Sequence, residues 1–129
     1  MNVREYIDED YETVAEWWQQ YHGTDFMPPQ YLPHLGYIAE CDGKMTAALF
    51  IYDPQVPICM LNFPVCNPSA GVKSKRKGLE SIVRHVQGFI VQGGIVAAFP
   101  YSRGLTKIFK DCGFKMVNEY NKEMVWGAY

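Results

Sequence analysis

The sequence predicts an α/β (α+β) fold in which helices cover a mixed sheet, and three observations support this. Segments with helical spacing of apolar residues alternate with short, strand-like apolar segments along the chain. An Asp-Gly pair joins two of the strand-like runs, which is typical of a β-hairpin. The length of 129 residues, with 48% hydrophobic and 20% charged residues, suits a single domain over residues 1–129. The predicted order is strand, helix, three strands, helix, strand, helix and two strands.

The N-terminal part predicts a short strand followed by an amphipathic helix. Asn2–Tyr6 is extended, and the acidic residues that follow supply an N-cap and favourable charge for a helix start. The buried stripe of the helix has the spacing i, i+3, i+4, i+7: Tyr11, Val14, Ala15 and Trp18. His22-Gly23 ends the helix. Residues 24–34 contain three prolines and form a loop or a short broken helix, which can line a substrate entrance.

The next part predicts a hairpin and a further strand. Residues 36–41 and 44–52 are strand-like, and Asp42-Gly43 forms the turn between them. Val56–Val65 is a third strand that contains two prolines. Because proline donates no hydrogen bond to a sheet, pairing is expected to stop or splay at Pro64, near the end of this strand.

Val72–Val86 is the most informative stretch, a basic turn with a glycine that leads into a helix. Four of the chain's twelve basic residues lie within five positions: Lys73, Lys75, Arg76 and Lys77. A strand, a basic turn and a helix in succession present peptide N–H groups and the positive end of the helix dipole to a phosphate. We therefore expect a site for a phosphorylated cofactor. The alternatives are a solvated loop or a patch for an acidic partner.

The remainder of the chain predicts one more buried strand, a helix and a closing hairpin. The helix that follows the basic turn is expected to end at Gly93-Gly94, and Ile95–Phe99 is the next strand. Ser102 caps the last helix, and Gly113 ends it. Two runs form the closing hairpin around Tyr120-Asn121: Phe114–Glu119 and Lys122–Trp126.

Composition disfavours several classes of function. The net charge of -2 disfavours a nucleic-acid-binding protein. The four cysteines form no C-x-x-C pair and the three histidines are scattered, so we expect reduced structural thiols and no metal site. The N-terminus has no apolar signal segment and no run is long enough to span a bilayer, so a cytoplasmic protein without a membrane partner is expected.

Two motifs, together with the order of elements over essentially the whole chain, resemble the GNAT superfamily of acyl-CoA-dependent N-acetyltransferases. Ser102–Phe114, SRGLTKIFKDCGF, looks like the family's pattern of Asn, an apolar-striped helix, an aromatic residue and Gly-Phe. Lys75–Glu80, KRKGLE, resembles the pyrophosphate loop Gln/Arg-x-x-Gly-x-Gly/Ala. The resemblance, that of a divergent member, implies a mostly antiparallel sheet of about six to seven strands, with helices on both faces. It also implies that the fourth and fifth strands are splayed.

The resemblance further implies acetyl-CoA as cosubstrate, with its pantetheine arm between the splayed strands. Backbone groups at Asn62–Val65 would bind the arm, and peptide N–H groups around Arg76–Leu79 would bind the pyrophosphate. The residues expected to bind the cofactor are Phe63, Val65, Lys73, Lys75, Arg76, Lys77, Gly78, Leu79, Ser102 and Phe109.

Two residues depart from the family pattern, and the catalytic residues remain unknown. Glu80 takes the place of a small residue and would bring a carboxylate near the pyrophosphate. Phe109 takes the place of a tyrosine thought to protonate the leaving thiolate, and phenylalanine has no proton to give. The candidates for a general base or other catalytic group are Glu40, Asp53 and Tyr101, with Asp25 and His34 as loop residues that could border the cleft. Cys66 is a further candidate, as a nucleophile.

The function implied is transfer of an acetyl group from acetyl-CoA to a primary amine, by direct attack in a ternary complex. The alternative is a catalytically inactive GNAT-fold protein that binds a protein partner or senses a CoA-like ligand. Seven of the fourteen acidic residues lie in the first 25 positions, which favours a cationic acceptor such as a small-molecule amine or a peptide. The acceptor, the acyl chain length and the oligomeric state stay open, a homodimer included.

Overall fold

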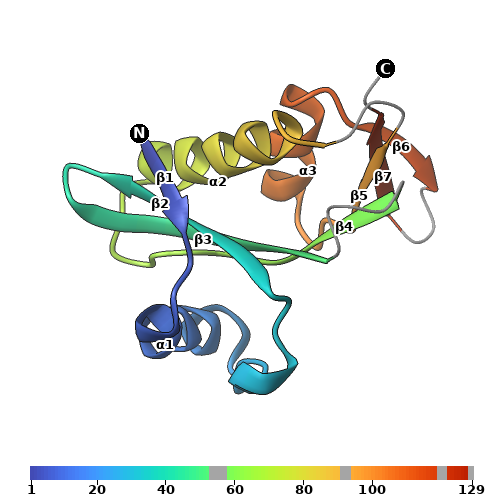
Figure 1. Ribbon diagram of the computed structural model, residues 1–129. Coiled ribbons are helices and arrows are strands. Elements are labelled where there is room, and N and C mark those ends of the chain that lie inside the picture. Colours follow the sequence, from blue (N-terminus) through green and yellow to red (C-terminus); the bar gives the residue numbers. More distant parts are fainter. Residues whose placement is uncertain (53–57, 91–93, 119–121, 128–129) are drawn as a thin grey trace.

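Figure 1 shows the computed structural model of the chain, which describes residues 1–52, 58–90, 94–118 and 122–127. Within these residues the strands form one seven-stranded sheet of order β1-β2-β3-β4-β5-β7-β6. The strands are β1 Asn2–Glu5, β2 Leu35–Cys41, β3 Lys44–Tyr52, β4 Ile58–Cys66, β5 Ile95–Ala98, β6 Lys115–Asn118 and β7 Glu123–Gly127. The α-helices are α1 Tyr11–His22, α2 Val72–Gln87 and α3 Arg103–Asp111. Short 3-10 helices span Asp8–Asp10 and Pro29–Tyr31.

The sheet is mixed but mostly antiparallel, because only β4 and β5 pair in parallel. Helix α1 covers one face, and α2 and α3 cover the other (Figure 1). Alternate residues of β3 supply the two cores: Ala48 and Phe50 face the α1 side, whereas Ala47 and Leu49 face the α2 side. The predicted fold class, the mixed sheet and the helices on both faces are therefore confirmed.

Several predicted element ends are confirmed by backbone geometry. Asp42 and Gly43 have φ of 52° and 78°, as the tight hairpin turn between β2 and β3 requires. Gly23 ends α1 with φ of 69°, and its N–H donates to the carbonyl oxygen of Gln19 at 2.8 Å. The hydroxyl of Ser102 caps α3 by accepting the Leu105 N–H at 3.1 Å.

Three predictions about helix ends were wrong. The basic stretch is not a turn, because α2 already begins at Val72 and Gly71 is its N-cap. That helix ends at Gln87 rather than at Gly93-Gly94, because Gly88 interrupts it first. The acidic segment gives α1 no side-chain cap: the Asp10 carboxylate instead bonds Arg4 at 2.8 Å and the Ile7 N–H at 3.0 Å. Asp53, Val56, Gly93 and the turn residues Tyr120 and Asn121 lie outside the described residues.

The predicted splay between β4 and β5 is present. The two strands pair only over Ile58–Met60 and Ile95–Ala97, and the rest of β4, Leu61–Cys66, continues past the last pair. Beside β3, β4 carries one extra residue, because Ala48 pairs with Val65 but Phe50 pairs with Asn62. This bulge spans Phe63 and Pro64, in the part of β4 that pairs with β3 but has no partner in β5.

No helix among the described residues has the length and apolarity needed to cross a membrane.

Candidate functional site

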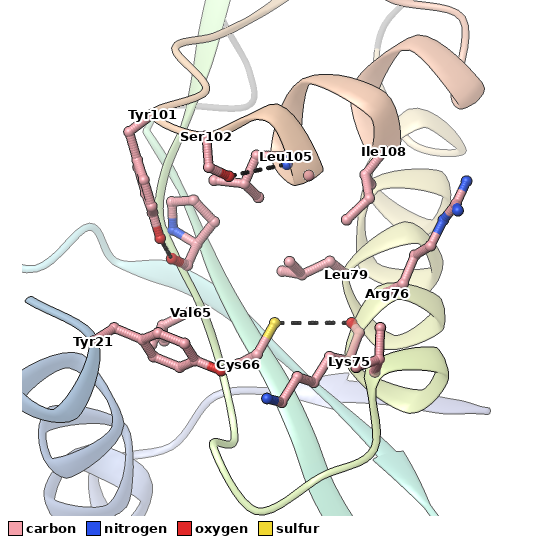
Figure 2. Close-up of a pocket in the computed structure, with 13 residues that line it drawn as sticks. Tyr21, Val65, Cys66, Lys75, Arg76, Leu79, Tyr101, Ser102, Leu105 and Ile108 are labelled. Carbon is pink, nitrogen blue, oxygen red and sulfur yellow. Dashed lines mark hydrogen bonds between the residues drawn. The ribbon is translucent and has the colours of Figure 1, made fainter.

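A cavity of about 380 Å³ lies between the end of β4, the start of α2 and the first turns of α3 (Figure 2). Its floor is apolar, with Val65 from β4, Leu79 from α2 and Leu105 from α3. Polar groups line its rim, among them Lys75 and Ser102. An elongated ligand with an apolar body and an anionic end is suited to such a site.

A second cavity, of about 140 Å³, occupies the gap where β4 and β5 diverge. It is lined by Leu61, Asn62 and Phe63 of β4, by Phe109 of α3 and by Trp18 of α1. Two residues, Pro64 and Tyr101, line both cavities. The splay therefore opens a small chamber that adjoins the larger groove.

Phe63, which lines the smaller cavity, holds an unusual backbone conformation. Its φ of 52° is left-handed, which costs an aromatic residue about 1 to 3 kcal/mol and is further disfavoured before proline. The ring is fixed by aromatic neighbours: its centroid lies 5.9 Å from that of Trp18, 5.6 Å from Phe26 and 6.3 Å from Phe50. The surrounding core thus maintains a strained residue at the candidate site.

The peptide groups available to an anion lie earlier in the sequence than expected. The Lys75 N–H donates to the Gly71 carbonyl oxygen at 3.0 Å, which is the first helical bond of α2. Only the N–H groups of Val72, Lys73 and Ser74 precede it within the helix. Those of Arg76–Leu79 lie inside α2 and bond the preceding turn, so the expected pyrophosphate contact with these four N–H groups has no free donors.

The four clustered cations have different surroundings. Figure 2 shows the Lys75 side chain directed toward Tyr21, and its Nζ lies 5.7 Å from the centroid of that ring. The stem of Arg76 lines the cavity, but its guanidinium points outward and bonds the Asp111 carboxylate. Lys73 and Lys77 are exposed and line neither cavity. Lys75 is thus the cation whose charge faces the larger cavity.

Gly78 and Glu80 of the predicted phosphate loop are directed elsewhere. A Cβ at Gly78 would lie 2.5 Å from Thr46 Oγ1 and 3.2 Å from Ala47 Cβ, so this glycine lets α2 approach β3. The Glu80 carboxylate accepts a hydrogen bond from Arg84 Nε at 3.1 Å and does not line the cavity. The Glu80 carboxylate is therefore paired along α2 and is not among the groups that line the larger cavity.

Cys66 lines the larger cavity as a thiol. Burial raises its pKa to about 12, although the neighbouring Lys75 acts in the opposite direction. Its Sγ contacts the Lys75 carbonyl oxygen at 3.8 Å (Figure 2). Because the thiolate is the nucleophilic form, this position does not favour a covalent mechanism.

Most candidates for a general base lie away from the cavities. Glu40 lines neither and bonds Arg4 Nε at 3.2 Å, and Asp25 and His34 also line neither. Asp53 is outside the described residues. No carboxylate is present among the described residues that line the two cavities. Of the general-base candidates that the structure describes, Tyr101 alone lines them.

Sequence reasoning missed Tyr21 and Trp18 as cavity residues. Both lie in the second half of α1, where Trp17 is the buried tryptophan and Trp18 is half-buried. Helical spacing shows which side chains of α1 share a face. It does not show that α1 packs against β4, and this contact brings Tyr21 and Trp18 to the cavities. Among the described residues no group of three or more His, Cys, Asp or Glu side chains could hold a metal ion.

This arrangement of sheet, splay and helices is the GNAT fold. An aminoglycoside 6'-N-acetyltransferase from Enterococcus faecium has a similar structure, with TM-score 0.71 and 9% identity over 100% of this chain and 98% of that one. The ribosomal-protein-S18-alanine N-acetyltransferase from Escherichia coli gives TM-score 0.66 and 12% identity over 96% and 88%. A GNAT family acetyltransferase from Brucella melitensis, in complex with acetyl-CoA, gives 0.64 and 11% over 98% and 86%.

No protein-family model matches the sequence, and a comparison with curated proteins found no match. At these identities the structural likeness establishes the fold, and the predicted resemblance to the GNAT fold is confirmed.

Proposed function

We propose that the protein is an N-acetyltransferase that transfers the acetyl group of acetyl-CoA to a primary amine by direct attack in a ternary complex. The observation that carries the proposal is the pair of adjoining cavities at the β4–β5 splay. The larger one suits the arm and phosphates of the cofactor, and the smaller one suits an acetyl group. The similar Brucella melitensis enzyme, whose structure contains acetyl-CoA, supports this choice of ligand.

The apolar floor of the larger cavity would hold the pantetheine arm along Val65, Leu79 and Leu105. The pyrophosphate would rest on the free N–H groups of Val72–Ser74, where the helix dipole also favours negative charge. Lys75 would add an ammonium contact from the same helix end. Of the cofactor contacts expected from sequence, we keep Phe63, Val65, Lys73 through its N–H, Lys75, Leu79, Ser102 and Phe109.

The chemistry would depend mainly on orientation. The amine nitrogen attacks the thioester carbonyl carbon while both substrates are held together, which removes much of the entropic barrier. No carboxylate among the described lining residues could deprotonate an ammonium acceptor, so the neutral amine must be drawn from solution. We therefore expect the transfer rate to rise with pH until the acceptor amine is fully neutral.

The acceptor would be cationic in solution. Glu12 and Glu16 are exposed on α1, the helix that supplies Trp18 to the smaller cavity. Asp8 and Glu9 add exposed carboxylates just before it, whereas Asp10 is neutralised by Arg4. A field of one sign near a cleft raises the local concentration of the opposite charge. Small amines, lysine side chains and peptide N-termini all fit this description.

Thermal unfolding with acetyl-CoA, free CoA and a short DNA duplex at two salt concentrations tests the proposal. At about a hundredfold excess over Kd, a bound ligand stabilises the native state by about 2.7 kcal/mol, a shift of several degrees. Lys75→Glu should weaken acetyl-CoA binding by at least about tenfold. Lys77→Glu is the matched control, because that ammonium lies on the same helix but lines neither cavity. Absence of any shift with either CoA species would overturn the proposal.

A second candidate is a GNAT-fold protein that binds a CoA-like ligand without catalysis. Phe109 at the smaller cavity and the lack of a lining carboxylate among the described residues favour it. Thiol release from acetyl-CoA across a panel of primary amines separates the two functions. Binding without thiol release for any amine would support the second candidate.

A further inference from the structure

The two cavities meet at one hydrogen bond. The Tyr101 hydroxyl donates to the Pro64 carbonyl oxygen at 2.9 Å, and these are the two residues that line both cavities. Figure 2 shows the Tyr101 side chain extending from the start of α3 toward β4. The ring is supported on one side by His22, whose ring centroid is 5.1 Å away. The phenolic oxygen thus lies where the two cavities meet, on a side chain that is 53% exposed.

This junction is where the reacting bond of a bound thioester would lie. A thioester that places its arm in the larger cavity and its acyl group in the smaller one would bring its sulfur next to Pro64 and Tyr101, the two residues that both cavities share. Proline carries no exchangeable proton. Among the described residues that line both cavities, the Tyr101 hydroxyl is the one group that can donate a proton there.

We propose that Tyr101 is a catalytic residue that protonates the departing thiolate of the acyl donor; this rests on the proposed acetyltransferase function. Phe109, which lines only the smaller cavity, cannot supply this proton. The proposed proton donor, Tyr101, therefore lies in the segment between β5 and α3 rather than within α3 itself.

The step balances as follows in atoms and electrons. The lone pair of the amine nitrogen forms the new C–N bond, and the C–S bond breaks with its electron pair passing to sulfur. The Tyr101 hydroxyl transfers its proton to that sulfur, which leaves as the free thiol. The phenolate then regains a proton from the acceptor nitrogen, directly or through water, so that the products are an amide and a thiol and the enzyme is unchanged.

The surroundings of Tyr101 suit this task. Burial raises the pKa of Tyr101 to about 12, with smaller contributions from Cys66 and Tyr21, so the hydroxyl keeps its proton at physiological pH. The Pro64 carbonyl oxygen accepts that proton in a hydrogen bond. Rotation about the Cζ–Oη bond redirects the proton to a bound sulfur without moving the ring.

Tyr101→Phe removes the hydroxyl and keeps the ring. We expect kcat for acetyl transfer to fall by about a hundredfold, within the range of general acid catalysis, while KM for acetyl-CoA changes by less than about threefold. The matched control is Tyr11→Phe, which also loses a tyrosine hydroxyl that donates to a backbone carbonyl, that of Met27 at 3.0 Å. Its kcat should stay within about twofold of the wild-type value.

A second measurement separates proton donation from support of the strand. Incorporation of 3,5-difluorotyrosine at position 101 retains the hydroxyl but makes the phenol more acidic. Activity should persist, and the rate should decline at high pH where the wild-type rate does not. A hydroxyl that only holds Pro64 would give the same pH profile in both proteins, and this result would overturn the inference.

The outcomes also separate this inference from the proposed function. If the wild-type protein neither binds acetyl-CoA nor releases thiol, both proposals fall. If the wild-type protein transfers acetyl and Tyr101→Phe does so with the same kcat, the inference about Tyr101 fails while the function stands. Should Tyr101→Phe fold poorly, judged by its circular dichroism and Tm, the fluorinated protein decides between the two roles.

Discussion

Substitution of Gly78 by alanine tests whether this glycine serves packing or phosphate binding. Gly78 is buried within α2, and an added Cβ would lie 2.5 Å from Thr46 Oγ1, 3.2 Å from Ala47 Cβ and 3.4 Å from Ala39 Cβ. Thr46 cannot simply turn away, because its buried hydroxyl donates to the Ala39 carbonyl oxygen at 3.2 Å. The added methyl group must therefore displace the helix or break a buried hydrogen bond.

The magnitude follows from two opposing effects. Overpacking a tight contact costs about 1 to 3 kcal/mol, and loss of a buried hydrogen bond costs a similar amount. Against this, replacing glycine by alanine inside a helix stabilises it by about 1 kcal/mol. We expect Gly78→Ala to lower the free energy of unfolding by about 0 to 2 kcal/mol net, measured by urea denaturation. Acetyl-CoA affinity of the folded protein should change by less than about threefold.

Two further variants make this test specific. Gly104→Ala is the control for helix propensity, because a Cβ there meets only Ser102 Oγ at 3.9 Å, so the protein should gain up to about 1 kcal/mol. In a Thr46→Ala background the cost of Gly78→Ala should shrink, since the obstructing oxygen is gone. If Gly78→Ala stabilises the protein, or costs the same in both backgrounds, the assignment of Gly78 to helix packing is wrong.

Three more predictions follow from the surroundings of single side chains. Asp10→Asn should lower the free energy of unfolding by about 1 to 3 kcal/mol at pH 7, because the Arg4 hydrogen bond loses its charge. That same bond lowers the pKa of Asp10 below 3.8, so the stabilisation is complete above about pH 4 and the variant and wild type should converge as the pH falls through the folded value. Cys66, with its pKa raised to about 12, should react with iodoacetamide far more slowly in the native protein than after denaturation, and acetyl-CoA should slow it further; fast native alkylation at pH 7 would contradict the burial of this thiol. Glu80→Ala should change acetyl-CoA affinity, measured by calorimetry, by less than about twofold, because the Glu80 carboxylate is paired with Arg84. A marked gain in affinity would instead indicate that Glu80 repels the pyrophosphate in the wild-type protein, as expected from the sequence.

The sequence was sufficient to predict the order of the elements and several of their ends. Asp42-Gly43 forms the predicted hairpin turn, and Ser102 caps the predicted helix. These features depend on local conformational preferences, such as the left-handed backbone that Asp and Gly tolerate and the side-chain oxygen that a helix start requires. Local preferences can be read from a few neighbouring residues, which explains why these predictions were correct.

The start of α2 shows where local reasoning failed. Lys73–Lys77 consists of residues that suit either a basic turn or a helix, and the glycine at position 78 suggested a turn. In the folded chain Gly78 is instead needed where α2 lies against Thr46 and Ala47, so the helix continues through it. Its packing against a strand some thirty residues earlier in the chain is not visible in a local motif.

What the sequence by itself determined is the α/β class, the likeness to the GNAT fold, and the weak point at Pro64, because periodicity, turn residues and proline act within one segment. What only the tertiary structure decided is which side chains meet. Tyr21 of α1 lines the larger cavity, and Pro64 of β4 and Tyr101 of the segment between β5 and α3 line both cavities. Their convergence depends on the sheet order and on the splay of β4 from β5. Long-range packing sets that geometry and gives Tyr101 its position, whereas the pairing of Glu80 with Arg84 is a local i, i+4 contact within α2.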